Sequence, residues 1–164
     1  MITLTFREFV HGEDLIDFGT SDLELYIVRN KNDILYIGMA RYGIYRRWFG
    51  DPGCHMNRGS LSGNSHIGVV IYDALPHSVD WNMDLFSPID VLEFLEIEYS
   101  WDEGRSKYRI LDPITESYRL CDIKYLESIM IRYLYPHYNS DGNNFGKPNE
   151  YFLKKYLSLY SKED

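Results

Sequence analysis

The stretch Leu23–Val28 reads LELYIV, and the stretch Asp33–Gly38 reads DILYIG. Both are rich in the β-branched and aromatic residues that are enriched in strands. A polar stretch from Arg29 to Asn32 separates them and suits a turn. The sequence therefore predicts a β-hairpin with strands at 23–28 and 34–38.

A third strand and a helix are indicated further along the chain. Apolar and polar side chains alternate toward Phe86, which predicts a half-buried strand over 79–86. Apolar side chains at helical spacing predict a helix over 122–135, which Pro136 ends. Together with the hairpin, these elements predict an α+β fold, in which a small three-stranded antiparallel sheet is flanked by helices.

The length of 164 residues suits a single domain, 1–164, with one hydrophobic core. We expect its core to span about 22–145 and an amphipathic C-terminal helix to follow at about 149–160. The apolar, acidic and charged residues of 89–120 resemble an insertion before the helix at 122. Residues 66–74 fit either a helix or a buried strand.

Composition indicates a folded chain, because 45% of the residues are hydrophobic and 16% are aromatic. No apolar run approaches the roughly 18 residues that span a bilayer, and the N-terminus lacks the zones of a signal peptide. We therefore expect an intracellular, cytoplasmic protein with no membrane partner. Cys54 and Cys121 stand outside any paired-ligand spacing, which argues against a zinc site.

The net charge of −8 argues at first against a polyanionic partner, because nucleic-acid affinity comes largely from neutralised phosphates. The charge is unevenly distributed, however. Residues 28–68 hold six basic and two acidic side chains, a local charge of +4 that leaves −12 elsewhere. A basic segment in an acidic protein is what a confined phosphate-binding site would look like, although ordinary surface scatter is the alternative.

The hairpin resembles that of the GIY-YIG nucleases, whose two name-giving motifs lie on adjacent strands. The second motif is intact as Tyr36-Ile37-Gly38, while the first, Glu24-Leu25-Tyr26, keeps the tyrosine but not the glycine and isoleucine. The two tyrosines are ten residues apart, a separation typical of the family. The family places a helix with an arginine next, often in a string like the IYRRW of Ile44–Trp48.

Two adjacent arginines compete for the role of the family's catalytic arginine. Matching the string selects Arg47, whereas counting from Gly38 without an extra loop residue selects Arg46. Adjacent helical side chains project about 100° apart, so only one of the two can face the tyrosines. We expect Arg47, because it borders the stripe that Ile44 and Trp48 would bury.

The resemblance continues on the helix expected at 122–135. In the family this helix carries a metal-binding glutamate and is followed by a Pro-x-x-Asn-like end, which matches Glu127 and, twelve residues later, Asn139. An acceptor-only carboxylate, completed by water and phosphate oxygens, suits one Mg²⁺ or Mn²⁺. The resemblance thus implies Glu127 as metal ligand and Asn139 as a residue that orients the final loop. A solvated helix carboxylate is the alternative for Glu127.

The family resemblance also implies roles for the tyrosines and a histidine. Tyr26 and Tyr36 would position or deprotonate the attacking water, with Tyr26 the better candidate for the base. Many relatives place a histidine four residues after the arginine, where this chain has Asp51, so His55 or His66 would take that role.

Several residues outside the reaction centre fit contacts to a nucleic acid. Gly38 would let the backbone approach closely beside the site. Basic side chains that contact phosphates position a nucleic-acid strand but do not recognise its sequence. The candidates for such contacts are Arg29, Lys31, Arg41 and Arg58.

These features predict a metal-dependent endonuclease that hydrolyses phosphodiester bonds in DNA, of the restriction type or phage-encoded, with RNA left open as a substrate. Cutting both strands with one site per chain favours a homodimer. The alternative from another class is a catalytically inactive module that keeps the nuclease fold and binds nucleic acid or protein. A structure-selective repair nuclease would normally bring partner domains, which this chain lacks.

Overall fold

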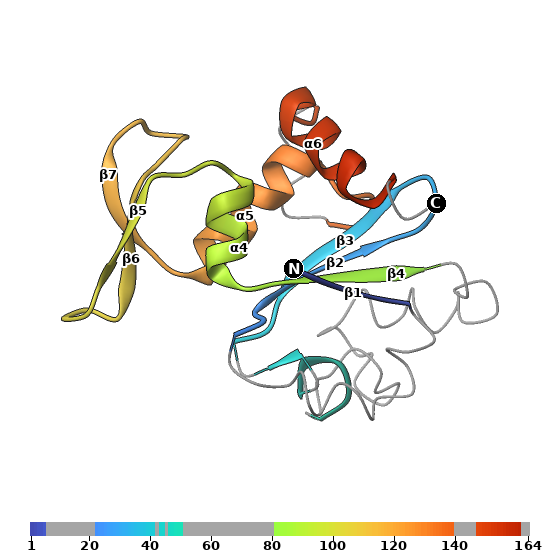
Figure 1. The fold of residues 1–164 in the computed structure, drawn as a ribbon, viewed down its shortest axis with the longest axis horizontal. Helices are drawn as coiled ribbons and strands as arrows, with labels where there is room; N and C mark the ends of the chain where they lie inside the picture. The colour runs from blue at the N-terminus through green and yellow to red at the C-terminus, as the bar shows by residue number, and fades with distance from the viewer. Residues whose placement is uncertain (6–21, 42, 45, 51–80, 140–146, 162–164) are drawn as a thin grey trace.

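The computed structural model of the chain describes residues 1–5, 22–41, 43–44, 46–50, 81–139 and 147–161. Its centre is a four-stranded antiparallel sheet in the order β1-β4-β2-β3 (Figure 1). The strands are β1 (Ile2–Thr5), β2 (Leu25–Arg29), β3 (Ile34–Met39) and β4 (Asn82–Phe86). The α+β class and the three predicted strands are confirmed. The predicted strand number was wrong, because β1 pairs with β4 as a fourth strand.

The hairpin of β2 and β3 forms because its turn is held by local hydrogen bonds. The Asn30 side chain accepts from the backbone N–H of Asn32 at 2.8 Å and from that of Asp33 at 2.7 Å. The resulting register pairs Tyr26 with Gly38 and Val28 with Tyr36. Since side chains alternate along a strand, both tyrosines lie on the same face of the sheet, as predicted.

Each face of the sheet packs against a different part of the chain. Three helices, α4 (Pro88–Phe94), α5 (Ile123–Leu134) and α6 (Glu150–Tyr160), cover the face that carries Leu25 and Ile27 (Figure 1). The opposite face is the tyrosine face. It packs against Ile44 and the short π-helical turn η1 (Arg46–Gly50), whose Trp48 is fully buried.

The two long helices begin and end close to the predicted limits. Asp122 caps α5 by accepting from the Tyr125 N–H at 3.3 Å, and Tyr135, with φ 53°, ends it one residue before Pro136. Asn149 caps α6 in the same way by accepting from the Phe152 N–H at 3.3 Å.

Residues 89–120 were predicted to be an insertion, and the structure divides them into two parts. Helix α4 buries Val91, Leu92 and Phe94 in the main core, so it belongs to the body of the fold. Its start is fixed by a capping box in which Ser87 and Asp90 exchange hydrogen bonds.

The second part of 89–120 forms a separate three-stranded antiparallel sheet, here called the arm. Its strands are β5 (Tyr99–Asp102), β6 (Lys107–Leu111) and β7 (Tyr118–Cys121), in that order. The charged stretch from Trp101 to Lys107 spans the end of β5, the turn that follows it and the start of β6. The arm projects beyond α4, away from the main sheet (Figure 1).

Arg29 was predicted to contact phosphates, and the structure corrects this. Arg29 is 3% exposed, and its Nε donates to the Asp84 carboxylate at 2.8 Å. Its guanidinium lies 4.1 Å from the centre of the Tyr160 ring, and Tyr156 donates from its hydroxyl to Asp84. Arg29 is therefore a core residue that ties α6 to the sheet.

Some predictions fall on residues outside the described part of the chain. These are the element at 66–74, residues 79–80 of the third strand, and the site residues His55, Arg58 and His66. Among the helices that the structure describes, none combines the length and the apolar character needed to cross a membrane.

Candidate active site

A pocket of about 400 Å³ opens on the tyrosine face beside the edge strand β3. It brings together residues from β2, β3, the loop after β3, η1 and α5. Its lining consists of Tyr26, Tyr36, Met39, Ala40, Arg41, Gly43, Arg47 and Glu127. Four of the predicted catalytic residues therefore meet in one place, although up to 101 positions separate them in sequence.

Gly38 makes room for the Tyr26 side chain. An added Cβ at Gly38 would lie 2.3 Å from the Tyr26 hydroxyl oxygen, a distance that no real Cβ contact allows. The Tyr26 ring therefore crosses directly over Gly38, with its centre 6.1 Å from that of Tyr36 and 5.3 Å from that of Trp48. Gly38 was predicted to let the backbone approach closely beside the site, and in the structure the group that lies against it is the Tyr26 side chain.

The turn that carries Arg47 is set by a glycine and two buried side chains. Gly43 has φ 101°, in the region that favours glycine, and its carbonyl accepts from the Arg47 N–H at 3.2 Å. Ile44 and Trp48 are both fully buried, as the predicted helix geometry requires. Consequently Arg47 lines the pocket, whereas Arg46 is exposed and does not.

The Tyr26 hydroxyl is buried beneath the pocket, where Arg47 donates a hydrogen bond to it. Burial, and next the nearby Tyr36, raise the pKa of Tyr26 well above its ordinary value, and Arg47 only partly opposes this rise. Tyr26 is therefore a protonated phenol at neutral pH. This environment disfavours the predicted role of Tyr26 as the base.

Glu127 reaches the pocket from α5. Its neighbours Leu126 and Met130 are fully buried, and Glu127 itself is half-buried at the margin of that apolar face. It also lies close enough to Tyr26 to disfavour a phenolate there. Its carboxylate is thus placed beside the two tyrosines and Arg47 rather than in open solvent.

Asn139 does not line the pocket, and it acts on the edge of β3 instead. Its side-chain oxygen accepts from the Ile37 N–H at 2.8 Å, and its amide nitrogen donates to the Ile37 carbonyl at 2.8 Å. The preceding residues His137 and Tyr138 donate from their backbone to Ile34 and Leu35. Residues 137–139 therefore cover the β3 edge as far as Ile37, consistent with the loop-orienting role expected of Asn139.

The remaining predicted phosphate contacts lie in different places. Arg41 is exposed, lines the pocket, and is paired with Asp122 at 3.0 Å. Lys31 is exposed in the β2–β3 turn and does not line the pocket. Among the described basic residues assigned to phosphate, which are Arg29, Lys31 and Arg41, it is Arg41 that lies beside the candidate catalytic side chains.

The donor set suits a hard cation that keeps most of its own water. Among residues 1–5, 22–41, 43–44, 46–50, 81–139 and 147–161, no three His, Cys, Asp or Glu side chains gather as a metal cage. Among the described residues, Glu127 is the one carboxylate that lines this pocket. Proteins commonly bind Mg²⁺ through a single carboxylate, with water and substrate phosphate oxygens as the remaining ligands. The pocket therefore fits the predicted Mg²⁺ or Mn²⁺ with Glu127 as its protein ligand.

Compared with known proteins, the chain matches no family model, no curated protein and no solved structure. The assignment of this site therefore rests on the motifs and on the pocket's own geometry.

Sequence reasoning missed part of the pocket wall. Met39 and Ala40 follow the second motif directly, and Gly43 begins the turn that presents Arg47. Gly43 could have been found from sequence, since a glycine just before a predicted helix often marks a backbone that other residues cannot adopt.

Proposed function

We propose that this chain is a divalent-metal-dependent endonuclease of the GIY-YIG type that hydrolyses phosphodiester bonds in DNA. One observation carries the proposal. Tyr26, Tyr36, Arg47 and Glu127, chosen from separate motifs, line a single pocket. If these side chains only packed the core or covered the surface, they would not be expected to line one open cavity together.

Arg47 is suited to stabilising the phosphate as negative charge grows on its oxygens. Its guanidinium keeps its proton under all ordinary conditions and offers several donors in a plane. The buried Tyr26 hydroxyl accepts from Arg47, so it fixes the direction of the guanidinium before substrate arrives. In this proposal Tyr26 is a positioning residue, and Arg47 is the group that touches the reacting phosphate.

Tyr36 is the better candidate to orient the attacking water and take its proton. Two phenolates at this distance would repel each other, so at most one of the two tyrosines ionises. Tyr26 is fully buried, whereas Tyr36 is partly exposed at the pocket wall. Tyr36 would first lose its own proton to the solvent in the pocket, and its phenolate oxygen would then take the proton of the attacking water.

Glu127 would hold Mg²⁺ or Mn²⁺ in the pocket. When bound, the ion supplies Lewis-acid stabilisation to a phosphate oxygen and to the leaving oxygen. Glu127 itself supplies the fixed negative charge that keeps the cation beside Arg47 and the two tyrosines. With the one such pocket that the described residues form, cutting of both strands would require a homodimer or two successive binding events.

Plasmid cleavage tests the proposal. Purified protein incubated with supercoiled plasmid and Mg²⁺ or Mn²⁺ should produce nicked and linear DNA, and EDTA should prevent it. Mapping the cut ends would define the target. DNA binding in Ca²⁺ without cleavage in either Mg²⁺ or Mn²⁺ would instead show the non-cleaving module. The same incubation with RNA distinguishes the two nucleic acids.

A further inference from the structure

A second and larger cavity, about 670 Å³, lies between the main sheet and the arm. This volume is within the range of sites that take a small organic ligand. Its lining comes from the loops beside β2 and β3, the start of α4, the start of α5 and the inner face of the arm. The residues of this arm cavity are Asp22, Glu24, Arg41, Ser87, Pro88, Ile89, Trp101, Ser106, Lys107, Tyr108, Cys121, Asp122 and Ile123.

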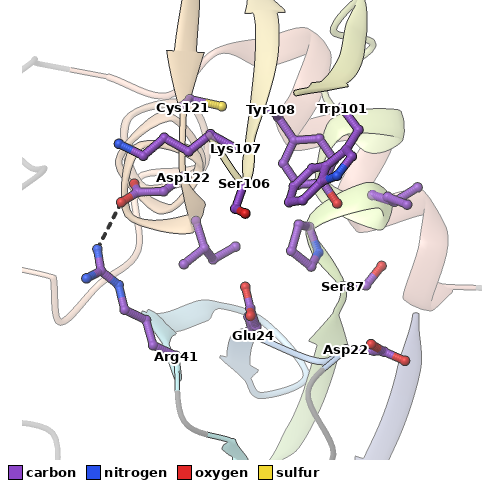
Figure 2. Close-up of a pocket in the computed structure, with 13 residues that line it drawn as sticks. Asp22, Glu24, Arg41, Ser87, Trp101, Ser106, Lys107, Tyr108, Cys121 and Asp122 are labelled. Carbon is purple, nitrogen blue, oxygen red and sulfur yellow. Dashed lines mark hydrogen bonds and ion pairs between the residues drawn. The ribbon is translucent and has the colours of Figure 1, made fainter. Parts of the chain in front are cut away.

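The arm supplies an aromatic wall. Trp101 pairs with Tyr108 across β5 and β6, and Tyr108 pairs with Cys121 across β6 and β7, so all three side chains share one face of the arm. Figure 2 shows Trp101 and Tyr108 turned toward the cavity, with ring centres 4.8 Å apart in an edge-to-face contact. Trp101 remains 51% exposed. An exposed indole braced by a second ring is a platform on which a nucleobase can stack.

Glu24 faces this wall from the opposite side. Its carboxylate points from the main sheet toward Ser106 and the two rings (Figure 2). Burial raises the pKa of Glu24 above its ordinary value, partly offset by the Arg41 charge. Within the part of the chain that the structure describes, this half-buried carboxylate has no hydrogen bond or ion pair of its own. It can therefore accept hydrogen bonds from a ligand.

The charge of the cavity indicates which part of a nucleotide it accepts. Three carboxylates line it, those of Asp22, Glu24 and Asp122, against the two cations Arg41 and Lys107. Asp122 is also already engaged, since it caps α5 and pairs with Arg41. An acidic lining repels phosphate, whereas a neutral base that donates from an amino group fits Glu24.

Arg41 connects the two cavities, because it lines both the arm cavity and the candidate active site. A strand whose phosphate lies beside Arg47 would therefore pass Arg41 before its neighbouring nucleotide reached the arm. We propose that the arm cavity binds an amino-bearing base, which means cytosine, adenine or guanine and not thymine, of the nucleotide next to the cleaved phosphate. Trp101 stacks on the base and Glu24 accepts from its amino group. This inference rests on the proposed nuclease function, with the base turned out of the duplex stack.

The test uses DNA duplexes that carry the plasmid-mapped cut sequence. The base next to the cut is varied among the four natural bases. Single-turnover cleavage in Mg²⁺ and equilibrium binding in Ca²⁺ are measured for wild type, Trp101→Ala and Glu24→Leu, a substitution that removes the accepting oxygens. Tyr118→Ala is the matched control, because Tyr118 is 62% exposed and lies on the other face of the same arm. Where plasmid is not cut, duplexes of random sequence with one unpaired base serve as the binding probe.

Wild type should favour cytosine, adenine or guanine over thymine by about tenfold, and Glu24→Leu, which removes the accepting oxygens, should remove that preference. Trp101→Ala should weaken binding of every duplex by roughly tenfold, while Tyr118→Ala should change neither the base preference nor the binding.

If wild type cleaves DNA, and both cavity variants cleave at the same rate and with the same base preference, this inference is overturned and the nuclease proposal stands. Trp101-dependent and Glu24-dependent binding without cleavage would support the base site and refute the nuclease. If no DNA is cleaved, and DNA binding is either absent or equal in all variants, both the base site and the nuclease proposal are refuted.

Discussion

Replacing Gly38 with alanine tests the packing that places Tyr26 in the candidate site. The added Cβ would lie 2.3 Å from the Tyr26 hydroxyl oxygen and 2.4 Å from its Cζ. Tyr26 is fully buried against Trp48 and borders the pocket, so the added Cβ would force the ring out of this packing and toward the pocket. Overpacking of this kind costs about 1–3 kcal/mol. At roughly 2–4 °C per kcal/mol for a chain of this size, the Tm should fall by about 2–12 °C.

Thermal unfolding of Gly38→Ala measures this cost, and Gly104→Ala is its control. A Cβ at Gly104 would meet its nearest atom at 3.5 Å, an ordinary contact, so that variant should melt like wild type. Tyr26→Val removes the ring, so adding Gly38→Ala to it should cost almost nothing. The displaced Tyr26 also releases Arg47, and cleavage should fall in Gly38→Ala. A Gly38→Ala protein that melts within about 1 °C of wild type and cleaves normally would refute the described packing.

Three further outcomes are expected. Arg47→Ala should lower the single-turnover cleavage rate by about 10²- to 10³-fold, whereas Arg46→Ala should mainly weaken DNA binding; the reverse pattern would reassign the arginine. Arg29→Ala leaves the Asp84 carboxylate buried without its main partner, so chemical denaturation should show a loss of about 3–5 kcal/mol; a loss near zero would mean that the pair is exposed in solution. Burial raises the pKa of the Cys121 thiol to about 11, so peptide-resolved alkylation at Cys121 should be slow at neutral pH in the native protein, faster as the pH approaches that pKa, and fast in urea. Equal rates in buffer and urea would contradict this burial.

The elements predicted correctly are those whose signal is local. The polar turn around Asn30 lies between two stretches of β-branched and aromatic residues, and the helix at 122–135 has both its cap and its terminating Pro136 in the sequence. Strand β1 was missed because four residues with one buried side chain, Leu4, carry little periodicity. Its pairing with β4, about 80 positions away, is a tertiary property.

The arm was missed for a different reason. Lys107 and Arg109 do alternate with Tyr108 and Ile110, but each strand of the arm has only four or five residues and most of their side chains are exposed or half-buried, so the pattern is too short to distinguish from a charged loop. Helix α4 was included in the supposed insertion because its acidic surface residues hide the buried Val91 and Leu92.

The site residues were predicted from the family resemblance. Residue types and spacing alone would not have identified them. Tyr26 and Glu127 are 101 positions apart, and only the fold brings them to one pocket. The same long-range effect explains the error at Arg29, whose partner Asp84 is 55 positions away. A basic residue in a locally basic segment suggests phosphate, but its burial depends on a carboxylate that no local pattern reveals.

Cleavage by Glu127→Gln tests the central claim most directly. The substitution keeps the size of the side chain and removes the charge that would hold the cation. Glu93→Gln is the control, since Glu93 is an exposed carboxylate on α4 and lines neither cavity. Wild type and Glu93→Gln should cut plasmid in Mg²⁺, while Glu127→Gln should bind DNA in Ca²⁺ as wild type does and not cut in Mg²⁺. Cleavage by Glu127→Gln at the wild-type rate would show that this pocket is not the metal-dependent active site.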